Sequence, residues 1–315
     1  MNRRPMVSII TPSYNQGEFI EDTILSITGQ TYRNLEHIVV DGGSTDNTLD
    51  ILRKYAGTYD LSWSSEPDEG MYQAINKGLK KAKGDILCYL NTDDLYLPWT
   101  LEAVVGYFTR NQQVDLLYGD IIHLDDTKGT IELTFSPPFN LKWAIVTGGL
   151  YQPAVFWSRR AYERVGGLDE TLQIGGDYEY WIRIAMRGSV KKVTEFLAVD
   201  RSHDNRKCFV QSDLSEEELS QIRRRYGAPT IPNEALKFIY RFYGYFWTRC
   251  YMTLFIVKSL RSDGRSRRFW PFFLNTGNVH LPSTSRLILR LLPYVGKRLS
   301  PWVINNLPIG CGKSL

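Results

Sequence analysis

From residue 7 to residue 119, short apolar runs alternate with amphipathic segments. The apolar runs have the length and the β-branched content of buried strands, and the amphipathic segments have the apolar spacing of helices. The predicted strands cover residues 7–11, 37–41, 61–64, 86–90 and 116–119, and the predicted helices cover 18–27, 45–55, 71–82 and 100–108. This βαβ alternation predicts an α/β fold, with a mostly parallel sheet covered by helices.

Polar residues gather where four of these strands end. The four segments are Thr-Pro-Ser-Tyr-Asn at 11–15, Asp-Gly-Gly-Ser-Thr-Asp at 41–46, Glu-Pro-Asp-Glu-Gly at 66–70 and Asn-Thr-Asp-Asp at 91–94. Sheets of this kind bind ligands at the carboxyl ends of their strands. We therefore expect the four segments to share one rim and to form a binding site there.

The alternation weakens after residue 116. Residues 125–129 predict a hairpin turn between strands at 121–124 and 130–135, followed by a helix at 178–186 and a strand at 190–196. The segment Gly-Ala-Pro-Thr-Ile-Pro at 227–232 is typical of a linker. The predicted organisation is an α/β domain over residues 1–226 and a helical tail over 227–315.

Composition agrees with a chain that has a real core, and charge separates its two parts. The 315 residues are 43% hydrophobic and 23% charged, with a net charge of +4. Residues 236–315 hold 13 Lys or Arg against the single Asp263, which leaves 25 basic and 33 acidic residues in 1–235. The first part is therefore −8 and the last part +12, and we expect them to face different partners.

Cysteine spacing and the first residues bear on the compartment. The four cysteines, Cys88, Cys208, Cys250 and Cys311, show no CxxC spacing, which argues against a zinc site and a disulfide framework. The apolar run at 7–10 is too short for a signal sequence. A reducing, cytoplasmic location is expected.

Cations and aromatic residues are interleaved in the tail at 236–315. Arg249 and Lys258 interrupt the best candidate for a spanning helix, so the sequence predicts a tail that lies on a membrane without crossing it. Basic aromatic helices bind anionic lipid surfaces, and this would place the protein at the inner face of the cell membrane. Packing of the tail on the α/β domain is the alternative. Nucleic acid is not expected as a partner, because no nucleic-acid-binding signature accompanies the charge.

Asp93 and Asp94 follow directly after a strand predicted to be buried. Two ionised carboxylates at such a position are unfavourable unless a positive group neutralises them, and oxygen ligands of this kind suit Mg or Mn. The alternative is a turn in which the carboxylates cap the next helix.

Asp41 is the second candidate, because it ends a strand and precedes two glycines. Its carboxylate can accept from the imide N–H of a uracil or thymine ring, or it can serve only to cap the helix that follows. Thr11, Ser13, Tyr14 and Asn15 supply hydroxyls, an aromatic face and an amide that fit contacts to a base and a ribose. Pro12, in the same segment, is included in the predicted nucleotide-sugar site.

Two common phosphate-binding patterns are missing from the chain. No GxGxxG follows the first strand and no GxxxxGK[ST] occurs, so dinucleotide and P-loop sites are excluded. A metal held by Asp93 or Asp94 would then neutralise a diphosphate.

Asp177 follows two glycines at the expected start of a helix. Its carboxylate is suited either to cap that helix or to take a proton from an acceptor hydroxyl.

In this order the motifs resemble family 2 glycosyltransferases, which bind nucleotide sugars on a GT-A fold. The matching segments are 11–15, 41–48, 66–78, 84–85, 91–94 and 177–183, within residues 5–225. The resemblance implies that Thr11, Tyr14, Asp41 and Asp68 surround the nucleotide.

The same resemblance assigns roles to the remaining candidates. It makes Asp94 the metal ligand and places Asp93 toward the ribose or the diphosphate. It makes Asp177 the general base of an inverting displacement, places Gln152 on the acceptor side and puts His203 near the diphosphate.

The expected function is metal-dependent transfer of one sugar from a UDP- or dTDP-sugar to a hydroxyl of a lipid-linked or polysaccharide acceptor, in cell-surface glycan synthesis. The lipid-linked acceptor is inferred from the basic tail alone. A sugar-phosphate nucleotidyltransferase and a nucleotide-sugar-binding protein without turnover are the alternatives. The former normally has a Gly-rich loop with Arg and Lys after the first strand, and residues 11–17 lack both.

Overall fold

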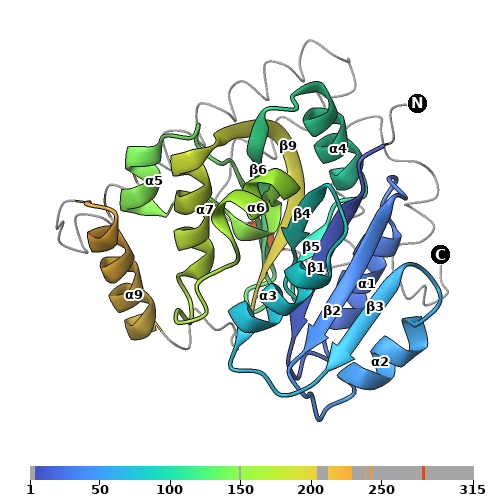
Figure 1. Ribbon diagram of the computed structural model, residues 1–315. Helices are drawn as coiled ribbons and strands as arrows, with labels where there is room; N and C mark the ends of the chain where they lie inside the picture. The colour runs from blue at the N-terminus through green and yellow to red at the C-terminus, as the bar shows by residue number, and fades with distance from the viewer. Residues whose placement is uncertain are drawn as a thin grey trace.

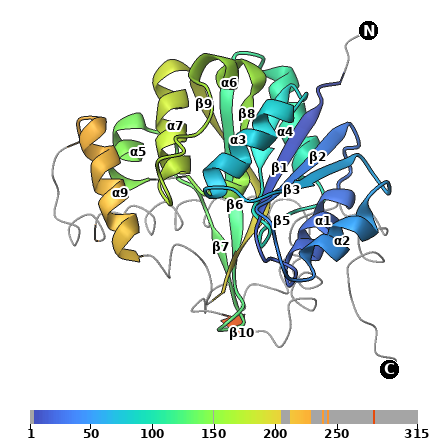
Figure 2. The same ribbon diagram turned by 60° about the horizontal axis from the view of Figure 1, so that its bottom comes forward.

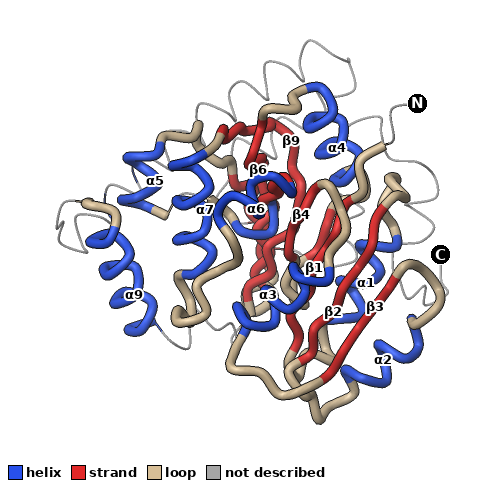
Figure 3. The backbone as a smooth tube through the Cα atoms, in the orientation of Figure 1, coloured by secondary structure: helices blue, strands red, loops and turns tan. Residues whose placement is uncertain are grey.

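A ten-stranded sheet with helices on both of its faces forms the centre of the computed structural model, which describes residues 4–148, 150–203, 212–228, 238, 242 and 279–280 (Figures 1 and 3). Its first half is the predicted βαβ series. The strands are β1 (Val7–Ser13), β2 (Leu35–Asp41), β3 (Leu61–Ser65) and β4 (Ile86–Tyr89), and the helices are α1 (Ile20–Thr28), α2 (Thr48–Tyr55), α3 (Met71–Lys81) and α4 (Thr100–Arg110).

These four strands are parallel and lie in the order β4-β1-β2-β3. Ser13 at the end of β1 is in register with Asp41 at the end of β2, and Asp41 is in register with Ser65 at the end of β3. The polar segments that follow these strands therefore start from one edge of the sheet, as the sequence predicted.

Side chains of β2 alternate between the two faces. Ile38 and Val40 belong to the large core cluster that includes Ile75 of α3, whereas Val39 packs with Ile24 of α1 and with α2. A strand that is apolar on both sides needs cover on both faces. Its all-buried pattern therefore explains why helices lie on each side of the parallel half.

The second half of the sheet adds strands that run in the opposite direction. β8 is antiparallel to both β4 and β6, β7 is antiparallel to β6, and the two-residue β5 is antiparallel to β9. The elements are β5 (Leu95–Tyr96), β6 (Val114–Asp125), β7 (Thr130–Thr134), α5 (Leu141–Thr147), the 3-10 helix η1 (Gln152–Ala154), β8 (Val155–Ser158), α6 (Arg159–Val165), α7 (Gly176–Arg187), β9 (Ser189–Ser202), α9 (Ser212–Arg225) and β10 (Val279–His280).

The predicted hairpin, helix and strand of this half are confirmed, with longer bounds except for β7, which ends one residue earlier than predicted. β6 is one continuous strand where the sequence suggested two, and β9 continues past residue 196 to Ser202. The extension matters, because it brings His203 to the same edge of the sheet as Asp93.

Helices α5 and α9 lie at the end of the molecule opposite α2 (Figures 1 and 2). Ile222 of α9 is buried against the main core cluster, so this helix packs on the catalytic part of the chain. The basic tail predicted to bind a membrane lies almost entirely outside the described residues. Within the described part of the chain, no helix is long and apolar enough to cross a membrane.

Candidate active site

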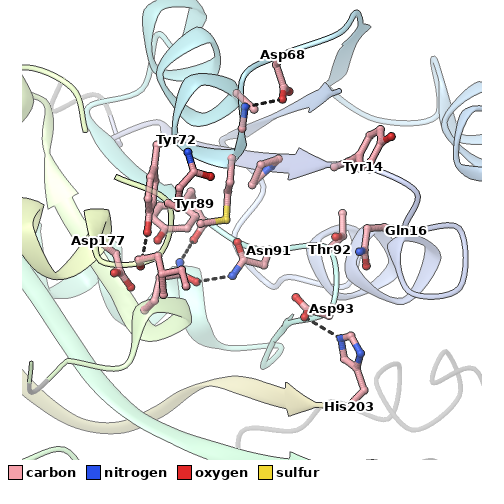
Figure 4. Close-up of a pocket in the computed structure, with 18 residues that line it drawn as sticks. Tyr14, Gln16, Asp68, Tyr72, Tyr89, Asn91, Thr92, Asp93, Asp177 and His203 are labelled. Carbon is pink, nitrogen blue, oxygen red and sulfur yellow. Dashed lines mark hydrogen bonds and ion pairs between the residues drawn. The ribbon is translucent and has the colours of Figure 1, made fainter. Parts of the chain in front are cut away.

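A cavity of about 440 Å³ opens at the carboxyl ends of β1 and β4 (Figure 4). This volume falls in the usual range for sites that hold small molecules. Among the predicted site residues it is lined by Pro12, Tyr14, Asp68, Asp93, Gln152 and Asp177, together with Asn91 and His203. The same lining includes Ser13, Gln16, Tyr72, Tyr89, Gln173 and Ile174.

Asp177 lies on one wall of the cavity, in the first turn of α7. Its Oδ1 accepts from its own neighbour's amide, Tyr178 N, at 2.7 Å. Positive partial charge at a helix N-terminus favours an ionised carboxylate. An ionised carboxylate facing a pocket is the state that a general base requires.

Tyr72 of α3 lies beside Asp177. Its hydroxyl donates to Ile174 O at 2.5 Å and accepts from Gly176 N at 2.9 Å. Burial and, second, the charge of Asp177 raise the pKa of Tyr72 well above its usual value. Tyr72 therefore stays protonated and holds the turn that carries Asp177.

Asp93 and His203 form a pair on another wall of the cavity. Asp93 Oδ2 lies 3.1 Å from His203 Nε2, and the imidazole stacks on Phe19 of the loop before α1, with ring centroids 4.6 Å apart. In the view of Figure 4, Asn91 lies between this pair and Asp177. The cavity thus has one carboxylate on each side of the space left for a ligand.

The wall between Asp177 and the Asp93–His203 pair is built by Asn91, Gln152 and Tyr89. Gln152 Nε2 donates to Tyr89 O at 2.7 Å, and Asn91 Nδ2 donates to Gln152 Oε1 at 3.1 Å. These bonds fix Asn91 so that its Oδ1 is buried and has no hydrogen-bond partner among the described residues. Buried acceptors of this kind are unfavourable unless a donor or a cation reaches them.

The donor set around Asp93 fits a divalent cation. The Asp93 carboxylate and the His203 imidazole are ligands that such ions accept in proteins, and Asn91 lines the same cavity. No group of three or more His, Cys, Asp or Glu able to hold a metal occurs within the described ranges. Any ion bound here would therefore keep water or substrate oxygens among its ligands.

Asp94 has a different environment from its neighbour Asp93. It is 1% exposed, and its Oδ1 accepts from Arg201 N of β9 at 3.1 Å. It is not among the residues that line the cavity. The assignment of Asp94 as a metal ligand stays a prediction, and in this conformation Asp93 is the member of the pair that faces the pocket.

Asp41 is buried beside the cavity without lining it. Its carboxylate accepts from Gly43 N, Ser44 N, Ser44 Oγ and Ser65 Oγ at 2.5–3.1 Å. These bonds fold the loop after β2. None of them comes from α2, whose N-cap residue is Asn47, so the alternative that Asp41 caps this helix is wrong. The predicted contact of Asp41 with a base is not tested by this geometry.

Thr11 and Asn15 also lie outside the lining. Thr11 is fully buried, and its Oγ1 is 2.9 Å from Nε2 of His37, whose pKa burial lowers to about 3. Asn15 adopts φ of 51°, and its Oδ1 accepts from Thr45 N at 2.8 Å. Thr11 links β1 to β2, Asn15 links the loops after these two strands, and the predicted contacts of both with a nucleotide stay predictions.

Tyr14 and Asp68 stand at the far side of the cavity from Asp177 (Figure 4). Tyr14 is 61% exposed, which leaves its ring open to stacking, and Asp68 Oδ1 accepts from Gly70 N at 3.0 Å. Aromatic rings exposed at a pocket mouth suit flat ligands such as nucleobases. The predicted contacts of Tyr14 and Asp68 with a nucleotide stay predictions.

Sequence reasoning missed Tyr72, Gln173 and Glu218 as parts of the site. Tyr72 lies in the segment 66–78 that resembles the family, but the sequence assigned no role to it. Glu218 had a usable signal, because it occupies an otherwise apolar face of α9, at i+4 from Leu214 and i−4 from Ile222. A carboxylate at such a position needs a buried partner.

Gly176→Ala tests the close packing beneath Asp177. A Cβ at this position would lie 2.6 Å from the Tyr72 ring, which is too close, so either the ring or the start of α7 must move. We expect a loss of about 1–3 kcal/mol in the free energy of unfolding and a clear fall in activity. Urea unfolding and an activity assay measure the two effects.

Gly106→Ala is the matched control. Gly106 lies inside α4, where a Cβ meets only the end of the Arg110 side chain, at 3.4 Å. Alanine is favoured over glycine there by about 0.5–1 kcal/mol. Equal losses from both variants would contradict the account of Gly176.

Comparison with known proteins places this site in a family. Residues 8–160 match the family model described as Glycosyl transferase family 2. An uncharacterised glycosyltransferase of Mycobacterium tuberculosis is 32% identical over 194 residues, which are 59% of this chain and 71% of the relative. A PGL/p-HBAD biosynthesis glycosyltransferase of Mycobacterium bovis is 31% identical over 182 residues, with 57% and 69% covered.

Solved structures show the same fold at lower identity. TarS of S. aureus in complex with UDP-GlcNAc has a TM-score of 0.59 and 20% identity, over 69% of this chain and 64% of that one. The mannosyltransferase PcManGT of Pyrobaculum calidifontis, in complex with GDP-Man and Mn2+, has a TM-score of 0.57 and 20% identity, over 97% and 85%.

The GT-A fold predicted from the sequence is confirmed by these structures. The relatives give no support to a nucleotidyltransferase or to a binding protein without turnover, since the curated ones are named glycosyltransferases. The chain therefore belongs to glycosyl transferase family 2 and is a glycosyltransferase.

Proposed function

We propose that the protein transfers a single sugar from a nucleotide-diphosphate sugar to a hydroxyl, with inversion at the anomeric carbon. The observation that carries this is the placement of Asp177 and the Asp93–His203 pair on opposite sides of one cavity. A donor lying with its diphosphate near Asp93 and its sugar toward Asp177 would present one face of the sugar to an acceptor.

Asp177 then acts as the base. The acceptor hydroxyl gives its proton to the Asp177 carboxylate while its oxygen bonds to the anomeric carbon. The bond from that carbon to the phosphate oxygen breaks, and the nucleoside diphosphate leaves with the electron pair. One displacement from the opposite face inverts the configuration.

Asp93, His203 and the Asn91 oxygen would hold Mn or Mg in this proposal, with Asp94 supporting their loop. Such an ion, when bound, neutralises the diphosphate and eases its departure. Two observations support it: the buried Asn91 Oδ1 without a partner among the described residues, and the structural neighbour solved with Mn2+. Asp94 as a direct ligand remains the assignment made from the sequence.

The donor and the acceptor are proposed as classes. A UDP- or dTDP-sugar is the donor expected from the sequence, and the neighbours were solved with UDP-GlcNAc and with GDP-Man. A lipid-linked or polysaccharide acceptor of the cell envelope is supported by the relative named for PGL/p-HBAD biosynthesis. The basic tail would hold the enzyme on the anionic inner face of the cell membrane.

A thermal-shift panel tests the donor class. We expect UDP or dTDP, and their sugars, to raise the melting temperature more with manganese than without it, because binding to the folded state stabilises by mass action. GDP and CDP are the competing bases, and pyrophosphate is the control without a base. A largest shift with GDP would contradict the uracil or thymine assignment, and no shift with any nucleotide would contradict the donor site.

A further inference from the structure

Side chains from distant parts of the chain hold the segment directly before Asp177. The backbone amides of residues 173–176 are consecutive, and all four donate to two side chains, those of Glu218 and Tyr72. Glu218 Oε1 accepts from Gln173 N at 2.7 Å, and Oε2 accepts from Ile174 N at 2.8 Å and from Gly175 N at 2.9 Å. Tyr72 accepts the fourth amide, Gly176 N.

Glu218 is a buried carboxylate, 6% exposed, on a helix whose other acidic residues include the exposed Glu217. An ionised carboxylate is strongly disfavoured in such surroundings unless hydrogen-bond donors surround it. Three amides satisfy that need here, and bonds to an ionised acceptor are stronger than neutral ones. The loop and α9 are therefore fixed to each other.

Other contacts keep α9 in place against this region. Arg225 Nη1 lies 3.0 Å from Asp169 Oδ2, and Tyr226 OH donates to Glu179 Oε1 at 2.5 Å. Gly175 permits the close approach, because a Cβ there would lie 2.7 Å from Ile222 Cδ1. The contacts of α9 thus reach both the segment before Asp177 and the helix that carries it.

We propose that Glu218 is a positioning residue that sets where Asp177, Gln173 and Ile174 stand in the cavity. The proposal rests on the proposed role of Asp177 as the base. The proposed nucleotide end of the cavity is lined by residues at the ends of β1, β3 and β4, and within the described residues none of them bonds to Glu218. Loss of Glu218 should therefore weaken the chemical step and leave donor binding intact.

Glu218→Gln is the test, and Glu217→Gln is its matched control. Glutamine has the shape of the glutamate side chain, but its Nε2 is a hydrogen-bond donor. It would face backbone amides that are also donors, so it cannot accept their bonds. Glu217 is on the same helix, is exposed, and accepts only a 3.3 Å bond from Gln221 in the described structure. The assay follows release of UDP from UDP-GlcNAc, or of GDP from GDP-mannose, with manganese and with water as the acceptor.

For Glu218→Gln we expect kcat to fall on the order of 10- to 100-fold, as for a reacting group displaced by about 1 Å. The donor KM and the Kd for the free nucleoside diphosphate should stay within about twofold of the wild-type values, since uniform binding is unchanged. Glu217→Gln should match the wild type in all three. A wild-type kcat in Glu218→Gln, or equal rises in KM and Kd, would overturn the positioning role.

Two further variants make every outcome decisive. If Glu218→Gln does not fold, Tyr72→Phe replaces it, because this variant removes the hydroxyl that accepts the fourth amide of the same segment. A loss of kcat at unchanged KM in Tyr72→Phe supports the proposal. A wild-type kcat overturns it. Asp177→Asn separates the two claims. If Asp177→Asn is inactive and Glu218→Gln is fully active, only the positioning role fails, whereas an active Asp177→Asn removes the base itself.

Discussion

Asp177→Asn is expected to reduce the rate of sugar transfer by about 10²- to 10⁴-fold, the usual contribution of a general base. Asparagine keeps the size of the side chain and can still accept from Tyr178 N, so the start of α7 should stay folded. It cannot take a proton from the acceptor. Release of nucleoside diphosphate measures the rate, and calorimetry should give a donor Kd close to that of the wild type.

Asp50→Asn is the control for this variant. Asp50 is exposed on α2 and pairs only with Arg53 at 2.6 Å among the described contacts, so its loss should leave the rate unchanged. Full transfer by Asp177→Asn with donor still bound would show that another group is the base. Loss of donor binding together with activity would instead point to a role for Asp177 in the nucleotide site.

Asp93→Asn is expected to weaken donor binding in the presence of manganese by about 10- to 100-fold, as losses of metal-site residues commonly do. The carboxylate faces the cavity beside His203, so the variant removes the negative charge that would neutralise a cation there. Without manganese, the affinities of variant and wild type should be similar. Calorimetric titration of the nucleoside diphosphate, with and without the ion, gives both values.

Asp85→Asn is the matched control, because Asp85 flanks the opposite end of β4 and accepts from Met6 N at 2.8 Å. It should respond to manganese as the wild type does. Asp94→Asn decides between the two members of the pair. If it abolishes the manganese response while Asp93→Asn retains it, the ligand assignment from the sequence is right and the one favoured by the geometry is wrong.

The parallel half of the fold was predictable because short apolar runs alternate with amphipathic segments and its central strands are buried on both faces. Ile38, Val39 and Val40 form an uninterrupted apolar run, and only a strand covered on both sides buries all three. The antiparallel half lacked this signal. β5 has two residues and β8 has four, so their pairing depends on β9 and β4, which are distant in the sequence.

The sequence also located the rim of the sheet but not the direction of its side chains. Asp41 ends a strand, Asp93 and Asp94 follow another, and the sequence predicted that all three bind ligand, each in a different role. Their environments differ because their partners are distant: Ser65 for Asp41, His203 for Asp93 and the Arg201 amide for Asp94. No local pattern encodes those contacts.

The partner of Glu218 could not be identified from the sequence either. The sequence shows an acidic residue on the apolar face of a helix, which signals a buried partner without naming it. The partner is a backbone segment 43–45 residues earlier, and amides have no sequence signature. Only the folded chain reveals that this helix supports the wall that carries Asp177.

The configuration of the sugar released from a nucleotide donor tests the proposed mechanism most directly. Proton NMR during the first turnovers of UDP-GlcNAc or GDP-mannose with manganese resolves the two anomers before they equilibrate. One displacement assisted by Asp177 predicts that the α-linked donor sugar appears first as the β-anomer, together with the nucleoside diphosphate. First release of the α-anomer would contradict it.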